Sequence, residues 1–291
     1  MNAGFWCTLV NLVGKARAIS YSKGMTLLSN MIRHLTKPQR PPAPEQEVTL
    51  PDAPLPPIAP EVPLCVIGDI HGCADLLETL SLKIAAEVDE DARIICVGDY
   101  VDRGDASAAV LQLLMEEATQ PGSRLTCLAG NHEDMLLQFL DDPQKTGRRW
   151  LRYGGLQTLA SFGLRGISET MAGPELDRAR DGLREAMGPA MEDWLRNLPL
   201  HVQSGNVAVV HAAADPDLPI AQQDRKVLLW GHDAFEQRPR TDGLWVVHGH
   251  TIVPAIRQQG GRLSLDTGAY ATGRLSAAIL DPDGTLRQLS T

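Results

Sequence analysis

Three stretches decide the fold: LCVIGDIHG at residues 64–72, RIICVGDYVDRG at residues 93–104 and RLTCLAGNHE at residues 124–133. Each begins as a short run rich in Leu, Cys and β-branched residues and ends in Gly followed by a short polar residue. Such runs are typical of buried strands that deliver a polar group at their carboxyl ends. The polar residues, Asp69, Asp99 and Asn131, are 30 and 32 positions apart (69 to 99 and 99 to 131), about one βαβ unit each. Helix-period runs at 76–88 and 108–117 lie between them, so we predict an α/β fold with the three strands side by side.

The three polar residues have two interpretations. Asp and Asn are good helix N-caps, and each residue taken alone fits that role. The carboxyl ends of strands in an open α/β sheet are also where ligands bind. The neighbouring residues favour ligands, because each stretch adds further charged or imidazole side chains: His71, Asp102, Arg103, His132 and Glu133.

Histidines are concentrated after predicted strands. Five of the eight lie just past such an end: His71, His132, His211, His248 and His250. A lone histidine is usually a core or surface residue, but five in this position indicate a site. The cysteines Cys65, Cys96 and Cys127 precede the polar residues and are expected to be buried strand residues.

Composition bounds the class of protein. The 291 residues carry 27 Lys or Arg against 36 Asp or Glu, and no stretch approaches the roughly 18 consecutive apolar residues of a membrane span. We therefore expect no integral membrane segment. The five cysteines are odd in number and form no C-x-x-C pair, which favours the reducing cytoplasm over a secreted disulfide framework.

The chain divides near residue 62. Residues 1–40 contain six basic residues and no acidic one, and ten prolines fall between positions 38 and 63. We interpret 1–62 as a disordered extension that could lie upstream of a start at Met25. A basic amphipathic arm and a signal peptide are the alternatives for its first 40 residues. Residues 63–291 form one domain with 21 basic against 32 acidic residues, a charge that disfavours nucleic acid as a partner.

The motifs GDIHG, GDYVDRG and GNHE, in this order, resemble those of the metal-dependent phosphoprotein phosphatases of the calcineurin-like metallophosphoesterase superfamily. The likeness is greatest to the bacterial and phage serine/threonine phosphatases and covers roughly residues 63–281. Segments 150–155, 158–163 and 265–268 also look like stretches of bacterial members. The resemblance implies a β-sandwich of two mixed sheets flanked by helices.

The resemblance also implies two divalent metal ions. Asp69, His71 and Asp99 would hold one ion, and Asp99, Asn131, His211 and His250 the other, with Asp99 bridging. An oxygen and nitrogen shell without thiolate suits manganese, our first expectation, and also iron, zinc or cobalt. A hydroxide bridging the ions would then attack phosphorus in line.

Three residues are expected to act beside the metals. His132 would protonate the leaving alkoxide, Asp102 would orient that imidazole, and Arg103 would grip phosphate oxygens together with Asn131. The family's second phosphate-binding arginine is missing, because His232 stands two positions after Trp230. Either His232 replaces it in binding substrate, or Arg238 or Arg240 does, or the substrate is not a simple phosphoserine monoester.

Three functional hypotheses follow. The first is a phosphatase acting on phosphoserine or phosphothreonine in a phosphoprotein or a small phosphorylated molecule. The second is the symmetrical diadenosine tetraphosphate hydrolase, a sister family that typically lacks the aspartate found here at Asp102 and has a bulky aromatic where this chain has Thr251. The third is a catalytically weak metal-binding scaffold that recruits partners through the proline-rich tail. The helical insertion expected at 175–198 is either a substrate-recognising cap or plain packing.

Overall fold

The computed structural model describes residues 55–291. The basic arm, most of the proline-rich segment and the alternatives raised for them lie outside the described residues.

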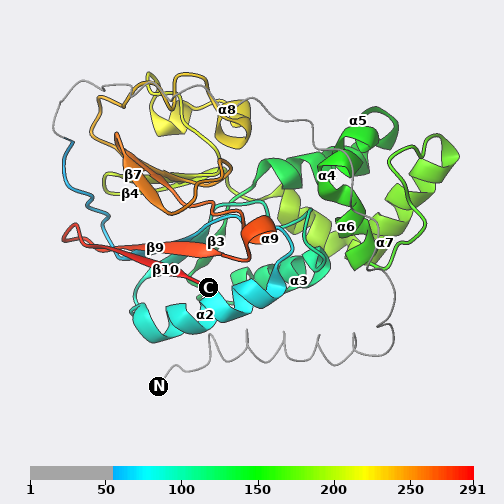
Figure 1. Ribbon diagram of the computed structural model, residues 1–291, viewed down its shortest axis with the longest axis horizontal. Coiled ribbons are helices and arrows are strands. Elements are labelled where there is room, and N and C mark those ends of the chain that lie inside the picture. Colours follow the sequence, from blue (N-terminus) through cyan, green and yellow to red (C-terminus); the bar gives the residue numbers. More distant parts are fainter. Residues whose placement is uncertain (1–54) are drawn as a thin grey trace, which may run out of the picture.

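Two five-stranded sheets form the centre of the described chain (Figure 1). The first has the order β10-β9-β1-β2-β3 and the second the order β4-β5-β6-β8-β7. The first sheet contains β1 (Leu64–Ile67), β2 (Arg93–Cys96), β3 (Leu125–Cys127), β9 (Ser276–Leu280) and β10 (Leu286–Ser290). The second contains β4 (His201–Ser204), β5 (Val207–Val210), β6 (Trp245–His248), β7 (Arg257–Gln259) and β8 (Arg262–Ser264).

Both sheets are mixed. In the first, β1, β2 and β3 run parallel while β9 pairs antiparallel with β1. In the second, β5, β6 and β8 run parallel while β4 and β7 are antiparallel neighbours. The predicted sandwich of two mixed sheets flanked by helices is therefore confirmed. The three parallel strands β1, β2 and β3 lie in the three stretches quoted from the sequence.

Alternating side chains of the central strands enter different cores. Cys65 and Ile67 pack among the helices, whereas Leu64 and Val66 pack against residues of the second sheet such as Val207. Because both faces of β1 are covered, its four residues are all buried, as a continuous apolar run predicts. Cys65, Cys96 and Cys127 are buried in their strands.

Helices cover the outer faces and one end. Elements α2 (Ala74–Glu87) and α3 (Ser107–Ala118) lie along the first sheet, and α8 (Arg225–Trp230) lies beyond the second (Figure 1). A helical group at one end contains α4 (Asn131–Asp141), α5 (Pro143–Trp150), a π-helical turn (Leu151–Gly155), α6 (Leu156–Ser161) and α7 (Pro174–Arg196). Two short elements, a 3-10 turn (Ile220–Gln222) and α9 (Ala269–Thr272), complete the described chain.

The expected helical insertion is α7, and it is broken at Gly188 (φ 72°, ψ 164°), directly before Pro189. That backbone region is open essentially to glycine alone, and proline disfavours a helical residue before it. The buried face of α7, which includes Leu176, Leu183 and Met191, joins the core that also contains residues of α4. The helix therefore packs on the domain.

Residues 55–62, the last part of the segment expected to be an extension, run along the second sheet. Ile58 is buried in the core between the sheets. The side chain of Asn206 accepts a hydrogen bond from Ala59 N (2.7 Å) and donates one to Pro57 O (2.8 Å), and Trp245 Nε1 donates to Pro56 O (2.8 Å). The expected boundary at residue 62 thus falls inside a segment that contacts the domain.

Candidate active site

The ends of five strands bring the predicted ligands together. Asp69, Asp99 and Asn131 follow the adjacent parallel strands β1, β2 and β3, so they emerge at one edge of the first sheet. His211 and His250 follow β5 and β6, which are parallel neighbours in the second sheet. None of Asp69, Asp99 and Asn131 is a helix N-cap, because the N-caps of α2, α3 and α4 are Cys73, Ala106 and Gly130.

Backbone strain is concentrated at the same place. In the described chain, five residues other than glycine have positive φ angles: His71, Asp99, Asp102, Arg103 and His250. All five are residues that the sequence predicted to be functional. Left-handed backbone is unfavourable for such residues, and strain of this kind gathers at functional sites where the surrounding structure enforces it.

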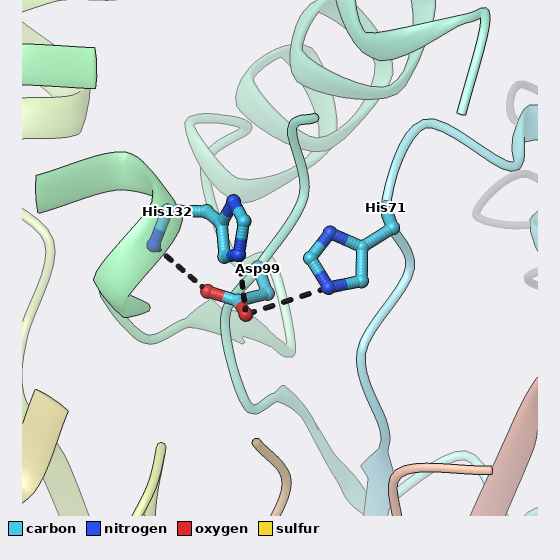
Figure 2. A group of neighbouring side chains, drawn as sticks. All are labelled: His71, Asp99 and His132. Atoms are coloured by element: carbon cyan, nitrogen blue, oxygen red, sulfur yellow. Dashed lines mark hydrogen bonds and ion pairs between the residues drawn. The ribbon is translucent and has the colours of Figure 1, made fainter. Parts of the chain in front are cut away.

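Asp99 lies at the centre of the site (Figure 2). Its Oδ2 is 3.5 Å from His71 Nε2 and 3.9 Å from His132 Nε2, and its Oδ1 is 3.3 Å from His211 Nε2. Although burial alone would raise it, the nearby histidines His211, His132 and His71 lower the pKa of Asp99. Two groups that could each hold a cation share this carboxylate: His71, Asp99 and His132, and Asp99, His211 and His250.

The imidazoles present their free nitrogens to the site. His71 Nδ1 lies 2.8 Å from Val101 O and His211 Nδ1 lies 3.0 Å from Val97 O, so each ring donates outward and directs Nε2 toward Asp99. Histidines that bind metal in proteins are oriented in this way. Burial lowers the pKa of His71 to about 3 and that of His211 to about 4, which keeps both rings neutral, the form that binds metal.

Asn131 joins the second group through its amide oxygen. Asn131 Oδ1 is 2.9 Å from His211 Nε2 and 2.9 Å from His250 Nδ1. Burial lowers the pKa of His250 as well, so it too is neutral. One amide oxygen and two neutral imidazoles meet beside Asp99, a donor set that suits first-row divalent metals.

Asp69 provides the test of whether a cation fits. Its Oδ2 accepts a hydrogen bond from His250 N (3.0 Å), but its Oδ1 is buried with no hydrogen-bond partner in residues 55–291. Burial, Asp266 and Asp99 raise the pKa of Asp69. An orphaned oxygen on a buried carboxylate beside a second carboxylate is unfavourable without a positive charge, so the residues present fit a divalent cation.

His132 and Asp102 form a hydrogen-bonded pair within the site. His132 Nδ1 is 2.6 Å from Asp102 Oδ2, and Nε2 faces Asp99. Burial lowers the pKa of His132, but Asp99 and Asp102 outweigh that effect, and the net shift is upward. The pair therefore favours the protonated imidazole, the form that a general acid requires.

Two further side chains hold Asp102 in place. Trp150 Nε1 donates to both carboxylate oxygens (3.1 and 3.0 Å), and Thr158 Oγ1 donates to Oδ1 (2.6 Å). With His132, these donors occupy both oxygens of a fully buried carboxylate. The stretches around Trp150 and Thr158 were noted in the sequence, but their role was missed, because 48 and 56 residues separate them from Asp102.

Arg103 lies at the edge of the site and is half-buried. Its Nη1 is 3.2 Å from His71 Nε2, and its guanidinium lies 4.8 Å from the ring centre of Tyr270. The fork of donors is thus placed beside the ligand cluster, where it can bind the oxygens of an anion.

Glu133 is a second residue whose role was missed. Its fully buried carboxylate accepts backbone hydrogen bonds from Asp99 (2.8 Å), Tyr100 (2.7 Å), Val101 (3.2 Å) and Gly130 (2.9 Å). These bonds fix the loop after β2 to the start of α4. The only sequence signal was its place in GNHE, which does not indicate backbone partners 30 positions earlier.

The candidates for a second phosphate-binding group are engaged elsewhere. His232 Nε2 lies 3.7 Å from Asp215 Oδ2, and Arg238 pairs with exposed Asp217 (2.6 Å). Arg240 is buried, pairs with Asp242, and donates to the carbonyl oxygens of Asp215 and Leu218. His248 is also buried, and its Nε2 lies 3.0 Å from Ser264 Oγ in the neighbouring strand β8.

The fold and this cluster of carboxylate, amide and imidazole groups define a metallohydrolase of the phosphoesterase type. The calcineurin-like phosphoesterase model matches residues 62–254, and the chain belongs to that family. No helix in residues 55–291 is long and apolar enough to cross a membrane.

Relatives carry two kinds of name. A bis(5'-nucleosyl)-tetraphosphatase PrpE (asymmetrical) from Bacillus velezensis is 27% identical over 234 residues, which covers 72% of this chain and 86% of the relative. Serine/threonine-protein phosphatase 2 from Escherichia coli is 28% identical over 228 residues, covering 72% and 89%. A solved structure provisionally named a diadenosine tetraphosphatase aligns with a TM-score of 0.54 at 21% identity, covering 79% of this chain and 94% of that one, and shares the fold.

Proposed function

We propose that this protein is a serine/threonine phosphatase that hydrolyses phosphate monoesters with two divalent metal ions, most simply Mn²⁺. The first ion would be held by Asp69, His71 and Asp99, and the second by Asp99, Asn131, His211 and His250. When bound, such ions neutralise phosphate charge and activate a water molecule as the nucleophile.

The observation that carries the proposal is the 2.6 Å contact between His132 and Asp102. An alkoxide leaving from serine or threonine is a strong base and needs a proton, which His132 can donate from Nε2. Asp102 holds the opposite nitrogen and favours the charged ring. Arg103 binds the oxygens of the transferred phosphoryl group and stabilises the charge that develops on them.

The second candidate is hydrolysis of dinucleoside tetraphosphates, which the names of several relatives support. The leaving group in that reaction is a nucleotide phosphate, a weak base that departs without a proton. A general acid such as His132, oriented by a buried carboxylate, has less to contribute there, so the His132 and Asp102 pair favours the monoester reaction. If the second candidate holds, the relatives' names favour asymmetrical cleavage over the symmetrical cleavage considered from the sequence.

The experiment compares products from two substrates. The manganese-loaded protein is given a phosphothreonine peptide and diadenosine tetraphosphate in parallel, with Asp99→Asn as the blank. Inorganic phosphate from the peptide supports the proposal. Nucleotide products from the dinucleotide, with the peptide intact, overturn it in favour of the second candidate.

The role of His132 is tested by changing the leaving group. We expect His132→Asn to lower turnover of the phosphothreonine peptide by about 10²- to 10⁴-fold. Turnover of p-nitrophenyl phosphate should fall far less, because p-nitrophenolate leaves without a proton. Metal content is measured on the same samples, and an equal loss on both substrates would contradict the acid role.

A further inference from the structure

A cavity of about 590 Å³ opens between the helical end of the molecule and α8. Its walls come from α4, α5 and α8 with the residue that precedes α8. The side chains that line it are mostly charged: Asp134, Gln138, Arg149, Asp224, Arg225, Lys226, Leu229 and Trp230. None of them belongs to the metal or proton-transfer groups described above.

Two short connections link the walls of the cavity to the active site. Asp134 is three positions after Asn131 in α4, so the two side chains lie on the same face of that helix, one turn apart. On the opposite wall, Leu228 O in α8 accepts a hydrogen bond from the backbone N–H of Ala212 (2.8 Å), the residue after His211. One wall of the cavity therefore lies a helical turn from the predicted ligand Asn131, and the other is hydrogen-bonded to the residue after His211.

The carboxylates of the cavity wall are already engaged. Asp134 pairs with Arg225 (3.1 Å) and accepts a hydrogen bond from Gln138 (2.7 Å). Asp224 accepts a hydrogen bond from the backbone of Lys226 (2.6 Å) at the start of α8. Arg149 and the Lys226 ammonium have no carboxylate within ion-pair distance in residues 55–291, so two cations in this wall are available to an anionic ligand.

The part of the cavity wall formed by Trp230 is less suited to a nucleobase than to an anion. The guanidinium of Arg149 lies 4.6 Å from the ring centre of Trp230, and the half-buried indole also packs against the main core. A base that stacks on the face of the indole covered by Arg149 would have to displace that guanidinium. An acidic side chain, in contrast, can approach Arg149 and Lys226 while the stacked arrangement remains.

We propose that this cavity is a substrate subsite that binds acidic residues flanking the phosphorylated residue of a phosphoprotein. The inference rests on the proposed phosphatase function and adds to it a substrate class, namely acidic phosphopeptides. A volume of about 590 Å³ accommodates one or two side chains of a peptide whose phosphate lies at the metal ligands.

The test compares two phosphothreonine peptides that differ only in flanking Glu or Gln residues. For the wild-type protein at low ionic strength we expect kcat/KM to be about threefold to tenfold higher for the acidic peptide, the range of a few exposed charge pairs. The double variant Arg149→Ala with Lys226→Ala should reduce that ratio to near one. The double variant Arg148→Ala with Lys145→Ala is the matched control, because both residues are exposed on α5 outside the cavity, and it should keep the wild-type ratio.

The results distinguish failure of the subsite from failure of the proposed phosphatase function. Equal kcat/KM for the two peptides in the wild type, or a preference that survives in the Arg149 and Lys226 variant, overturns the subsite while the phosphatase function stands. Loss of diadenosine tetraphosphate turnover alone in that variant reassigns the cavity to a nucleotide and overturns the inference. If p-nitrophenyl phosphate is hydrolysed but neither peptide is, the proposed function fails and the subsite fails with it.

Discussion

Asp102 is one of two carboxylates that raise the pKa of His132, and the direction of the effect of its removal can be predicted. Asp99 and Asp102 raise the pKa of His132 despite burial, and the rate should fall as pH rises through that pKa, because the acid then loses its proton. Asp102→Asn removes one negative charge and lowers the pKa of His132. We therefore expect a lower kcat and a basic limb of the pH profile shifted to lower pH with the phosphothreonine peptide.

The matched control is Asp217→Asn, which neutralises an exposed carboxylate paired with Arg238. Its pH profile should coincide with that of the wild type. A basic limb that stays in place in Asp102→Asn would show that His132 is not the titrating acid.

At single positions, the sequence predicted the side chains that meet in the site and missed several of those that hold them in place. Asp99 and His132 stand in short motifs whose chemistry can be interpreted locally. Glu133 accepts three of its four backbone hydrogen bonds from residues more than 30 positions earlier, and Thr158 donates to Asp102, 56 positions away; no local pattern indicates such partners. The sequence also could not show that His232 lies beside Asp215, because that contact depends on the path of a loop.

The turn between α5 and α6 shows how an element far along the chain shapes the site. Gly154 in this turn has φ 113°, and its carbonyl accepts a hydrogen bond from Arg103 N (3.4 Å). A Cβ atom there would lie 2.5 Å from Arg103 N and 3.0 Å from Asp102 Cβ. We expect Gly154→Ala to destabilise the fold by more than the roughly 1 to 2 kcal/mol of left-handed strain and to lower kcat/KM severalfold.

Gly163→Ala is the control for that strain. Gly163 also has a positive φ (85°), but an added Cβ would meet no atom within 4 Å. Urea unfolding and peptide turnover of both variants separate the effects, and equal losses in the two proteins would contradict a role for the turn in placing Arg103 and Asp102.

Elements with strong local signals were predicted, and elements made by tertiary contacts were not. The apolar run LCVI at 64–67 became β1, as its short length, its β-branched residues and the Gly that follows it indicate. The π-helical turn at Leu151–Gly155 had no such signal, since its form follows from the packing of Gly155 against Trp150 and of Gly154 against Arg103.

At the scale of the molecule, the site exists because two sheets meet at one edge. Asp99 and Asn131 come from the first sheet, while His211 and His250 come from the second. The apolar runs and βαβ spacing predicted the three parallel strands of the first sheet, but the sandwich and the convergence of both sheets came from the resemblance to a family. Periodicity alone cannot show which face of one sheet covers another.

Because buried acids meet at that edge, we expect the stability of the protein to depend on bound metal. Burial, Asp266 and Asp99 raise the pKa of Asp69, so at neutral pH, above the unfolded pKa, its ionisation destabilises the native state. A cation that binds only the native state should add about 2.7 kcal/mol at 100 times its Kd, or roughly 5 to 10 °C in Tm. We expect chelator to lower the Tm of the wild type by this amount and Mn²⁺ to restore it.

Asp69→Asn should raise the Tm of the chelated protein and reduce the rise with Mn²⁺, whereas Asp217→Asn should match the wild type. A Tm that is equal with chelator and with Mn²⁺ would contradict metal binding at Asp69.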